Sequence, residues 1–123
     1  MGEQRKKMLY VQTSGVDTPE RLYAPLILAA TAAATDIDAT VYFVIKGVTA
    51  LKKGEAEKIK IGNFPALKEV LDQALKSGVK IMACERSCQL LGIPRDEILS
   101  EAKLVGAATL NDLVLEADGV QYF

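Results

Sequence analysis

The chain has 123 residues, which suffices for one compact hydrophobic core and is too short for two ordinary domains. Half of the residues are apolar and a quarter are charged, as in globular proteins rather than disordered or fibrous ones. The 15 basic and 16 acidic side chains nearly balance, whereas a dedicated nucleic-acid binder carries a strong basic excess. We therefore expect a single domain over residues 1–123 and no nucleic-acid partner.

The longest apolar stretch, residues 23–35, is too short to span a membrane. It contains Pro25 and is diluted with alanine and threonine, whereas a membrane helix needs about 20 apolar residues. The basic segment 1–7 leads into a strand pattern and not into a small-residue cleavage site, so no signal peptide is expected. These features predict a cytoplasmic protein without a membrane partner.

Five short segments carry the β-branched, aromatic and apolar residues typical of strands. They are residues 8–13, 40–45, 79–84, 103–106 and 119–123. Their apolar residues are continuous and do not alternate with polar ones, which favours parallel strands that are covered on both faces.

The first helix is expected over residues 18–35, with Thr18 as N-cap and Pro19 at the first helical position. Its middle is apolar nearly all round, which predicts that the sheet, or the sheet and a neighbouring subunit, covers it. Pro25 predicts a kink.

Two further helices are predicted from helical spacing and stop signals. One opens at residues 63–65 and ends at Ser77-Gly78, and the other runs from an N-cap at Thr109 to residue 117. Residues 46–62 fit neither period, so we expect a short helix at 48–52 and then a loop. The lysines there are most simply a solvated surface.

Strands alternating with helices predict an α/β fold, specifically a flavodoxin-like three-layer sandwich with a five-stranded parallel sheet. The expected strand order is 2-1-3-4-5. Ligands of such sheets bind at the carboxyl ends of the strands, where the order reverses. This order would place the loop of residues 14–18 beside Cys84.

Cys84 and Cys88 are the only cysteines, and Cys84 closes the third predicted strand. A following helical turn would direct unpaired N–H groups at its sulfur, and Arg86 and Lys46 are candidate cations, while Glu85 would oppose them. Since the chain has no histidine, Cys-His and Ser-His catalysis are excluded and a zinc site is disfavoured. Cys84 is therefore either a reactive thiolate or a buried small hydrophobe.

Cys88 has two interpretations as well. On a helix it would lie one turn beyond Cys84, roughly 6 Å away between Cα atoms, which is within disulfide reach although the geometry is usually poor. It is either a resolving cysteine or a core residue beside Leu91.

The loop after the first strand could cradle an anion at the start of the following helix. It resembles flavodoxin phosphate loops, yet Asp17 would repel a phosphate, and seven aromatic residues without tryptophan offer little to hold a flavin. A simple turn with a capping threonine is the plainer interpretation. The candidate binding residues are Thr13, Ser14, Gly15, Asp17, Lys46, Gly47 and Arg86.

Nearly the whole chain resembles the DsrE/DsrF-like sulfur-relay family. The resemblance rests on the order of Thr13-Ser14-Gly15-Val16-Asp17, Pro19-Glu20-Arg21, Val41-Tyr42-Phe43, Gly47-Val48, Gly78-Val79-Lys80-Ile81, Ala83-Cys84, Gly92-Ile93 and Leu115-Glu116-Ala117-Asp118. It implies a flavodoxin-like fold, a trimer or hexamer, and a sulfur donor or acceptor protein as partner. The cysteine that carries sulfur as a persulfide in active members maps onto Cys84, while the match at Cys88 is less secure.

The resemblance implies a cytoplasmic, homo-oligomeric sulfur carrier or sulfurtransferase-like protein that needs no metal and no organic cofactor. Two other functions stay open at this point. One is a non-catalytic module that binds a small anion or nucleotide between the loop of residues 14–18 and Cys84. The other is a structural subunit in which both cysteines are merely buried.

Overall fold

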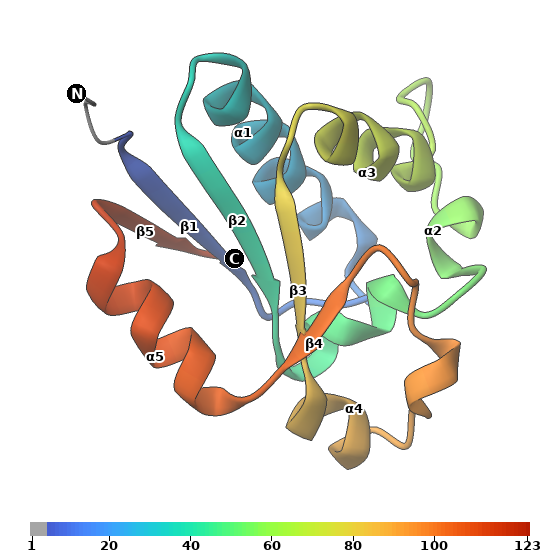
Figure 1. Ribbon diagram of the computed structural model, residues 1–123. Coiled ribbons are helices and arrows are strands. Elements are labelled where there is room, and N and C mark those ends of the chain that lie inside the picture. Colours follow the sequence, from blue (N-terminus) through green and yellow to red (C-terminus); the bar gives the residue numbers. More distant parts are fainter. Residues whose placement is uncertain (1–4) are drawn as a thin grey trace.

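A computed structural model describes residues 5–123, so part of the basic segment at residues 1–7 lies outside the described residues. Strands and helices alternate along the chain (Figure 1). The strands are β1 (Lys7–Gln12), β2 (Asp38–Phe43), β3 (Lys80–Cys84), β4 (Lys103–Val105) and β5 (Gly119–Tyr122). The α-helices are α1 (Tyr23–Ala34), α2 (Glu55–Lys58), α3 (Leu67–Lys76), α4 (Glu85–Leu90) and α5 (Ala107–Glu116). Three 3-10 turns are η1 (Pro19–Arg21), η2 (Ile45–Leu51) and η3 (Arg95–Glu97).

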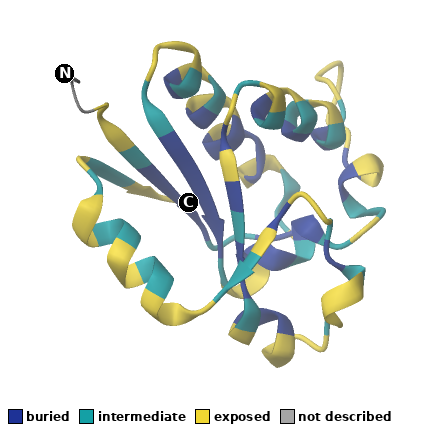
Figure 2. Cartoon of the chain, in the orientation of Figure 1, coloured by how far each residue is buried: buried dark blue, intermediate teal, exposed yellow. Residues whose placement is uncertain are grey.

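The fold is a three-layer α/β sandwich around a five-stranded parallel sheet, as the sequence predicts. Helices α1 and α3 pack side by side on one face, and α5 covers the other (Figure 1). Figure 2 shows β2 buried along nearly its whole length between these layers. The continuous apolar character of β2 follows from this burial on both faces.

The predicted strand order is wrong. The order is β4-β3-β2-β1-β5, so β1 pairs with β2 and β5, and β2 separates β1 from β3. The crossovers through α1 and α3 run in one direction over one face, and the crossover through α5 returns over the other face. Since right-handed connections place the helix according to the direction of travel, the change of direction moves α5 to the opposite side. The loop of residues 14–18 is thus one strand further from Cys84 than expected.

Three local predictions also differ from the structure. The helix expected to kink at Pro25 is instead two elements, η1 and α1, and Pro25 falls in the first turn of α1, where no intrahelical N–H is needed. Thr18 occupies the predicted N-cap position, now of η1, but its side chain makes no capping hydrogen bond, and its hydroxyl donates to the Gly15 carbonyl at 3.4 Å. The helix expected from Thr109 begins at Ala107 with Gly106 as N-cap.

The segment of residues 46–62 is more ordered than the sequence suggests. It contains most of η2, which starts at Ile45, and the short helix α2, which the spacing does not predict. Both bury apolar side chains against the main core, including Val48 and Ala56. Tertiary packing therefore holds a segment whose own periodicity is weak.

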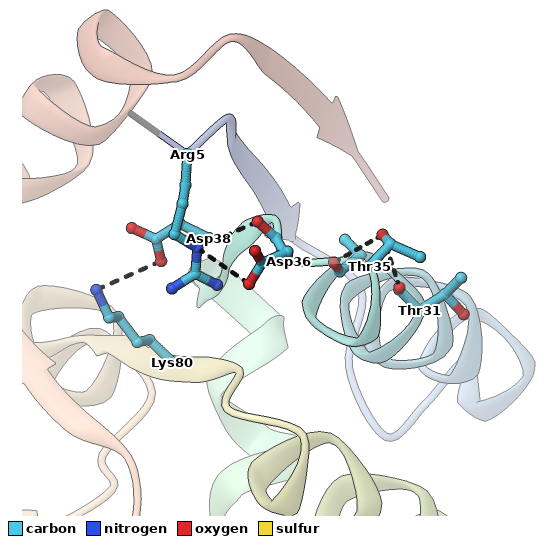
Figure 3. A network of polar contacts seen from close by, with 7 residues as sticks. Arg5, Thr31, Thr35, Asp36, Asp38 and Lys80 are labelled. Atoms are coloured by element: carbon cyan, nitrogen blue, oxygen red, sulfur yellow. Dashed lines mark hydrogen bonds and ion pairs between the residues drawn. The ribbon is translucent and has the colours of Figure 1, made fainter. Parts of the chain in front are cut away.

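A group of polar contacts lies at the amino-terminal ends of the strands (Figure 3). The Lys80 ammonium lies 3.4 Å from the Asp38 carboxylate, and these two residues begin β3 and β2. Arg5 donates to the Asp36 carbonyl at 3.1 Å, in the turn between α1 and β2. Because the strands are parallel, these contacts lie at the opposite end of β3 from Cys84.

Candidate functional site

Cys84 lies at the carboxyl end of β3, immediately before α4. It pairs with Val105 of β4 in the sheet register and packs on the α5 face with Leu9, Val11 and Tyr42. Only 6% of the residue is exposed. An interior strand thus fixes the sulfur at the edge of an apolar layer.

Four groups that can donate hydrogen bonds surround the Cys84 sulfur and lower its pKa. Burial by itself raises the pKa of this thiol, but hydrogen bonds from the Ser87 hydroxyl, the Ser87 N–H, the Tyr42 hydroxyl and the Arg86 N–H outweigh it, so the pKa of Cys84 is lowered. The two N–H groups belong to the first turn of α4, where helix geometry leaves them without intrahelical partners. The site therefore favours a thiolate.

The same interactions raise the pKa of Tyr42, through burial first and then through the negative charge and hydrogen bonding of Cys84. The Tyr42 hydroxyl also donates to the Gly106 carbonyl at 3.0 Å, just before α5. A buried tyrosine hydroxyl needs such partners. Tyr42 therefore stays protonated and remains a hydrogen-bond donor beside the sulfur.

Cys88 belongs to the other face of the sheet. It is 3% exposed and packs in the main core, whereas Cys84 packs in the cluster under α5. Its pKa is raised by burial and by the negative charge of Cys84. The structure thus gives the two cysteines different surroundings, one that favours a thiolate and one that favours a thiol.

The charged residues near the cysteines do not act as the sequence suggests. The Lys46 ammonium lies 2.7 Å from the Asp17 carboxylate and lowers the pKa of Asp17. Arg86 acts on the sulfur through its backbone N–H, and Arg86 itself is exposed. Glu85 forms an ion pair with Arg95, which reduces the opposing charge that Glu85 would bring to the thiolate.

The predicted binding loop uses its polar groups within the protein. Thr13 donates its hydroxyl to the Phe123 carbonyl at 2.7 Å, and Ser14 accepts a hydrogen bond from Arg21 at 3.0 Å. The Val16 N–H donates to the Thr49 hydroxyl at 3.0 Å. These contacts support the interpretation of this segment as a structural turn.

Gly15 and Gly47 have a packing role. A Cβ on Gly15 would overlap the Lys46 carbonyl, and a Cβ on Gly47 would overlap the Gln12 carbonyl. Both glycines let the loop after β1 and the turn η2 after β2 approach each other closely. They position η2, and η2 in turn reaches the cysteine site.

Sequence reasoning missed Ser87 and Tyr42. Ser87 is three residues after Cys84, the spacing at which a side chain in the first turn of a helix meets the residue before it. Tyr42 is a tyrosine within an otherwise apolar strand, and its hydroxyl had to find a buried partner. Both signals can be recognised in the sequence. Only the pairing of β2 with β3 shows that Tyr42 lies beside Cys84.

The fold and the site together define a small α/β protein with a buried cysteine at the carboxyl end of an interior parallel strand. The chain belongs to the DsrE/DsrF-like family, whose model matches residues 6–123. Its sequence is similar to two proteins of Methanocaldococcus jannaschii. The uncharacterized protein MJ0760 is 28% identical over 84% of this chain, and the uncharacterized protein MJ0989 is 30% identical over 85% of this chain and 88% of its own length. The chain spans only 38% of MJ0760.

Solved structures show the same fold at low sequence identity. The ychN protein of E. coli has a TM-score of 0.72 and 17% identity, with 98% of this chain and 100% of that chain covered. The protein of unknown function MTH1491 of Methanobacterium thermoautotrophicum has a TM-score of 0.65 and 13% identity, with 96% and 99% covered. Within residues 5–123, no helix is both long and apolar enough to cross a membrane.

Proposed function

We propose that the protein is a sulfur carrier that accepts sulfur as a persulfide on Cys84 and passes it to an acceptor thiol. The observation that carries this proposal is the set of hydrogen bonds that lowers the pKa of a nearly buried cysteine. A thiolate is the nucleophile in sulfur transfer, and a structural cysteine in an apolar layer needs no such support. Membership of the DsrE/DsrF-like family agrees with this chemistry.

The transfer balances without a metal or an oxidant. In the loading step, the Cys84 thiolate attacks the outer sulfur of a donor persulfide, the donor S–S bond breaks, and the electron pair leaves on the donor thiolate. The product is Cys84-S-SH. An acceptor thiolate then attacks that outer sulfur, and Cys84 leaves as a thiolate again. The sulfur atom is passed on without a net change in oxidation state.

The test uses the Cys84→Ser variant beside the Cys88→Ala variant. After treatment with glutathione persulfide, intact-protein mass spectrometry should show a gain of one sulfur atom in the unsubstituted protein and in Cys88→Ala, and none in Cys84→Ser. Equal uptake by Cys84→Ser would rule out Cys84 as the carrier. Alanine is the matched replacement at position 88 because this side chain packs in an apolar core.

We propose further that the protein acts in the cytoplasm and forms a homo-oligomer through α1. This helix has no charged residue, and its Ile27 and Leu28 are 39% and 40% exposed. A groove of about 470 Å³ lies between α1 and α3. Phe64 also lines this groove, so the apolar surface extends beyond α1. A second copy of the chain would cover this surface, because a helix that is apolar all round is normally buried.

Light scattering after size-exclusion chromatography tests this assembly. The Leu28→Glu variant should shift the protein to a monomer, while Leu115→Glu on α5, where the leucine is 83% exposed, serves as the control and should leave the mass unchanged. A monomer in the unsubstituted protein would contradict the proposal.

A further inference from the structure

We propose that the hydroxyls of Ser87 and Tyr42 promote the release of sulfur from Cys84 more than its capture. This inference rests on the proposed function, and it concerns the direction in which the site favours transfer. It follows from the two different tasks of the Cys84 Sγ atom. Sγ is the nucleophile when sulfur arrives and the leaving group when sulfur departs.

Ser87 is placed as a donor to this sulfur. It is one of three buried polar residues among the described part of the chain, and its Oγ accepts the Ile45 N–H at 2.7 Å. With Oγ accepting there, the hydroxyl proton is left to donate elsewhere, and hydrogen bonding by Ser87 lowers the pKa of Cys84, the residue that immediately precedes α4. The serine is therefore fixed from both sides.

Ile45, which donates its N–H to Ser87, has a strained backbone conformation. Its φ of 57° lies in the left-handed region, which a β-branched residue rarely adopts, and its side chain is 51% exposed. Burial of the side chain thus does not account for the conformation, which directs the N–H at Ser87. Strain of this kind persists where surrounding contacts over-determine the local structure.

Tyr42 approaches the sulfur from the neighbouring strand. Its single hydroxyl proton has two acceptors, the Gly106 carbonyl at 3.0 Å and the Cys84 sulfur. A thiolate is the stronger acceptor because it is charged. Donation to the sulfur therefore strengthens as negative charge develops on Sγ.

These donors affect the two transfer steps unequally. In delivery, the acceptor attacks the outer sulfur of Cys84-S-SH, the bond between that sulfur and Sγ breaks, and the electron pair goes to Sγ. Hydrogen bonds that stabilise the Sγ anion make it a better leaving group. In loading, the same bonds lower the nucleophilicity of Sγ while they raise the thiolate fraction, and the two effects partly cancel.

Single-turnover rates test the inference in the Cys88→Ala background. Loading is measured with glutathione persulfide, and delivery with cyanide, which removes the outer sulfur as thiocyanate and leaves the Cys84 thiolate. In Ser87→Ala, delivery should slow about tenfold while loading changes by less than about threefold. The pH profile of Cys84 alkylation should move to higher pH, a shift that loss of packing alone would not produce.

Ser87→Thr keeps a hydroxyl and should recover most of the delivery rate. Ser77→Ala, at the opposite end of β3 where the Ser77 hydroxyl donates to the Gln73 carbonyl, is the matched control and should leave both rates unchanged. If circular dichroism shows that Ser87→Ala does not fold, Tyr42→Phe removes the other side-chain donor and should slow delivery selectively in the same way.

Equal slowing of loading and delivery, or an unchanged delivery rate in the folded variant, would overturn the inference. Failure of the unsubstituted protein to load would instead overturn the proposed function. That failure is visible before any delivery rate is compared, so the two results are distinguishable.

Discussion

A Cβ atom on Gly15 would overlap the carbonyl oxygen of Lys46, so the loop after β1 and the turn η2 are in direct backbone contact. The segments that follow the neighbouring strands β1 and β2 therefore pack directly against each other. Because η2 begins with Ile45, whose N–H donates to Ser87, the contact also supports the cysteine site from a distance.

The Gly15→Ala variant should therefore lose stability by about 1–3 kcal/mol, as expected when extra volume is forced into a packed site. The measurement is the free energy of unfolding in urea. Gly106→Ala is the control, because a Cβ at Gly106 would meet no atom within 4 Å, so this variant should lose less stability than Gly15→Ala and only through the poorer N-cap propensity of alanine. Equal stability of the two variants would mean that the loops can separate without cost.

Alkylation of both cysteines should increase with pH, but the two profiles should shift in opposite directions from that of free cysteine. In Cys88→Ala, the lowered pKa of Cys84 predicts that this thiol reacts with iodoacetamide at a lower pH than free cysteine does. In Cys84→Ala, the raised pKa and burial of Cys88 predict slow labelling until the protein is unfolded. Mass spectrometry of labelled protein over a pH series reads both. Faster labelling of Cys88 would contradict the assigned roles.

Folding stability should rise with pH through the ionisation of Cys84. The folded state has the lower pKa, so above the unfolded-state pKa the full contribution is present, and it is lost as pH falls through the folded-state pKa. The comparison of Cys88→Ala with the double variant Cys84→Ala/Cys88→Ala isolates this term in urea titrations. The single variant should gain stability over that window relative to the double variant, and parallel curves would refute the ionisation.

Relief of the backbone strain at Ile45 should stabilise the protein. Ile45→Gly removes an exposed β-branched side chain from a positive φ and should raise the free energy of unfolding by about 1 kcal/mol. Asp36→Gly is the matched control, because Asp36 also has a positive φ, of 70°, yet aspartate tolerates this region better. A gain at position 36 as large as at position 45 would show that the strain is not specific to the β-branched residue.

The sequence was sufficient for the α/β class, the approximate strands and the position of Cys84 at the end of β3. These features depend on local signals. The apolar residues of β2 and β3 follow one another without regular polar alternation, as in strands that are covered on both faces, and Ser77-Gly78 ends α3 where Gly78 takes a φ of 97°.

Only the tertiary structure decided which strands are neighbours and what surrounds the sulfur. Periodicity along a chain shows which residues are buried but not where each crossover returns, so the pairing of β1 with β2 and β5 could not be derived from it. The same long-range packing directs Lys46 to Asp17, turns Tyr42 toward Cys84 and places Cys88 on the opposite face. The sequence by itself determined that Cys84 ends the third strand, because strand and helix signals are local, and the contacts between distant segments determined what surrounds its sulfur.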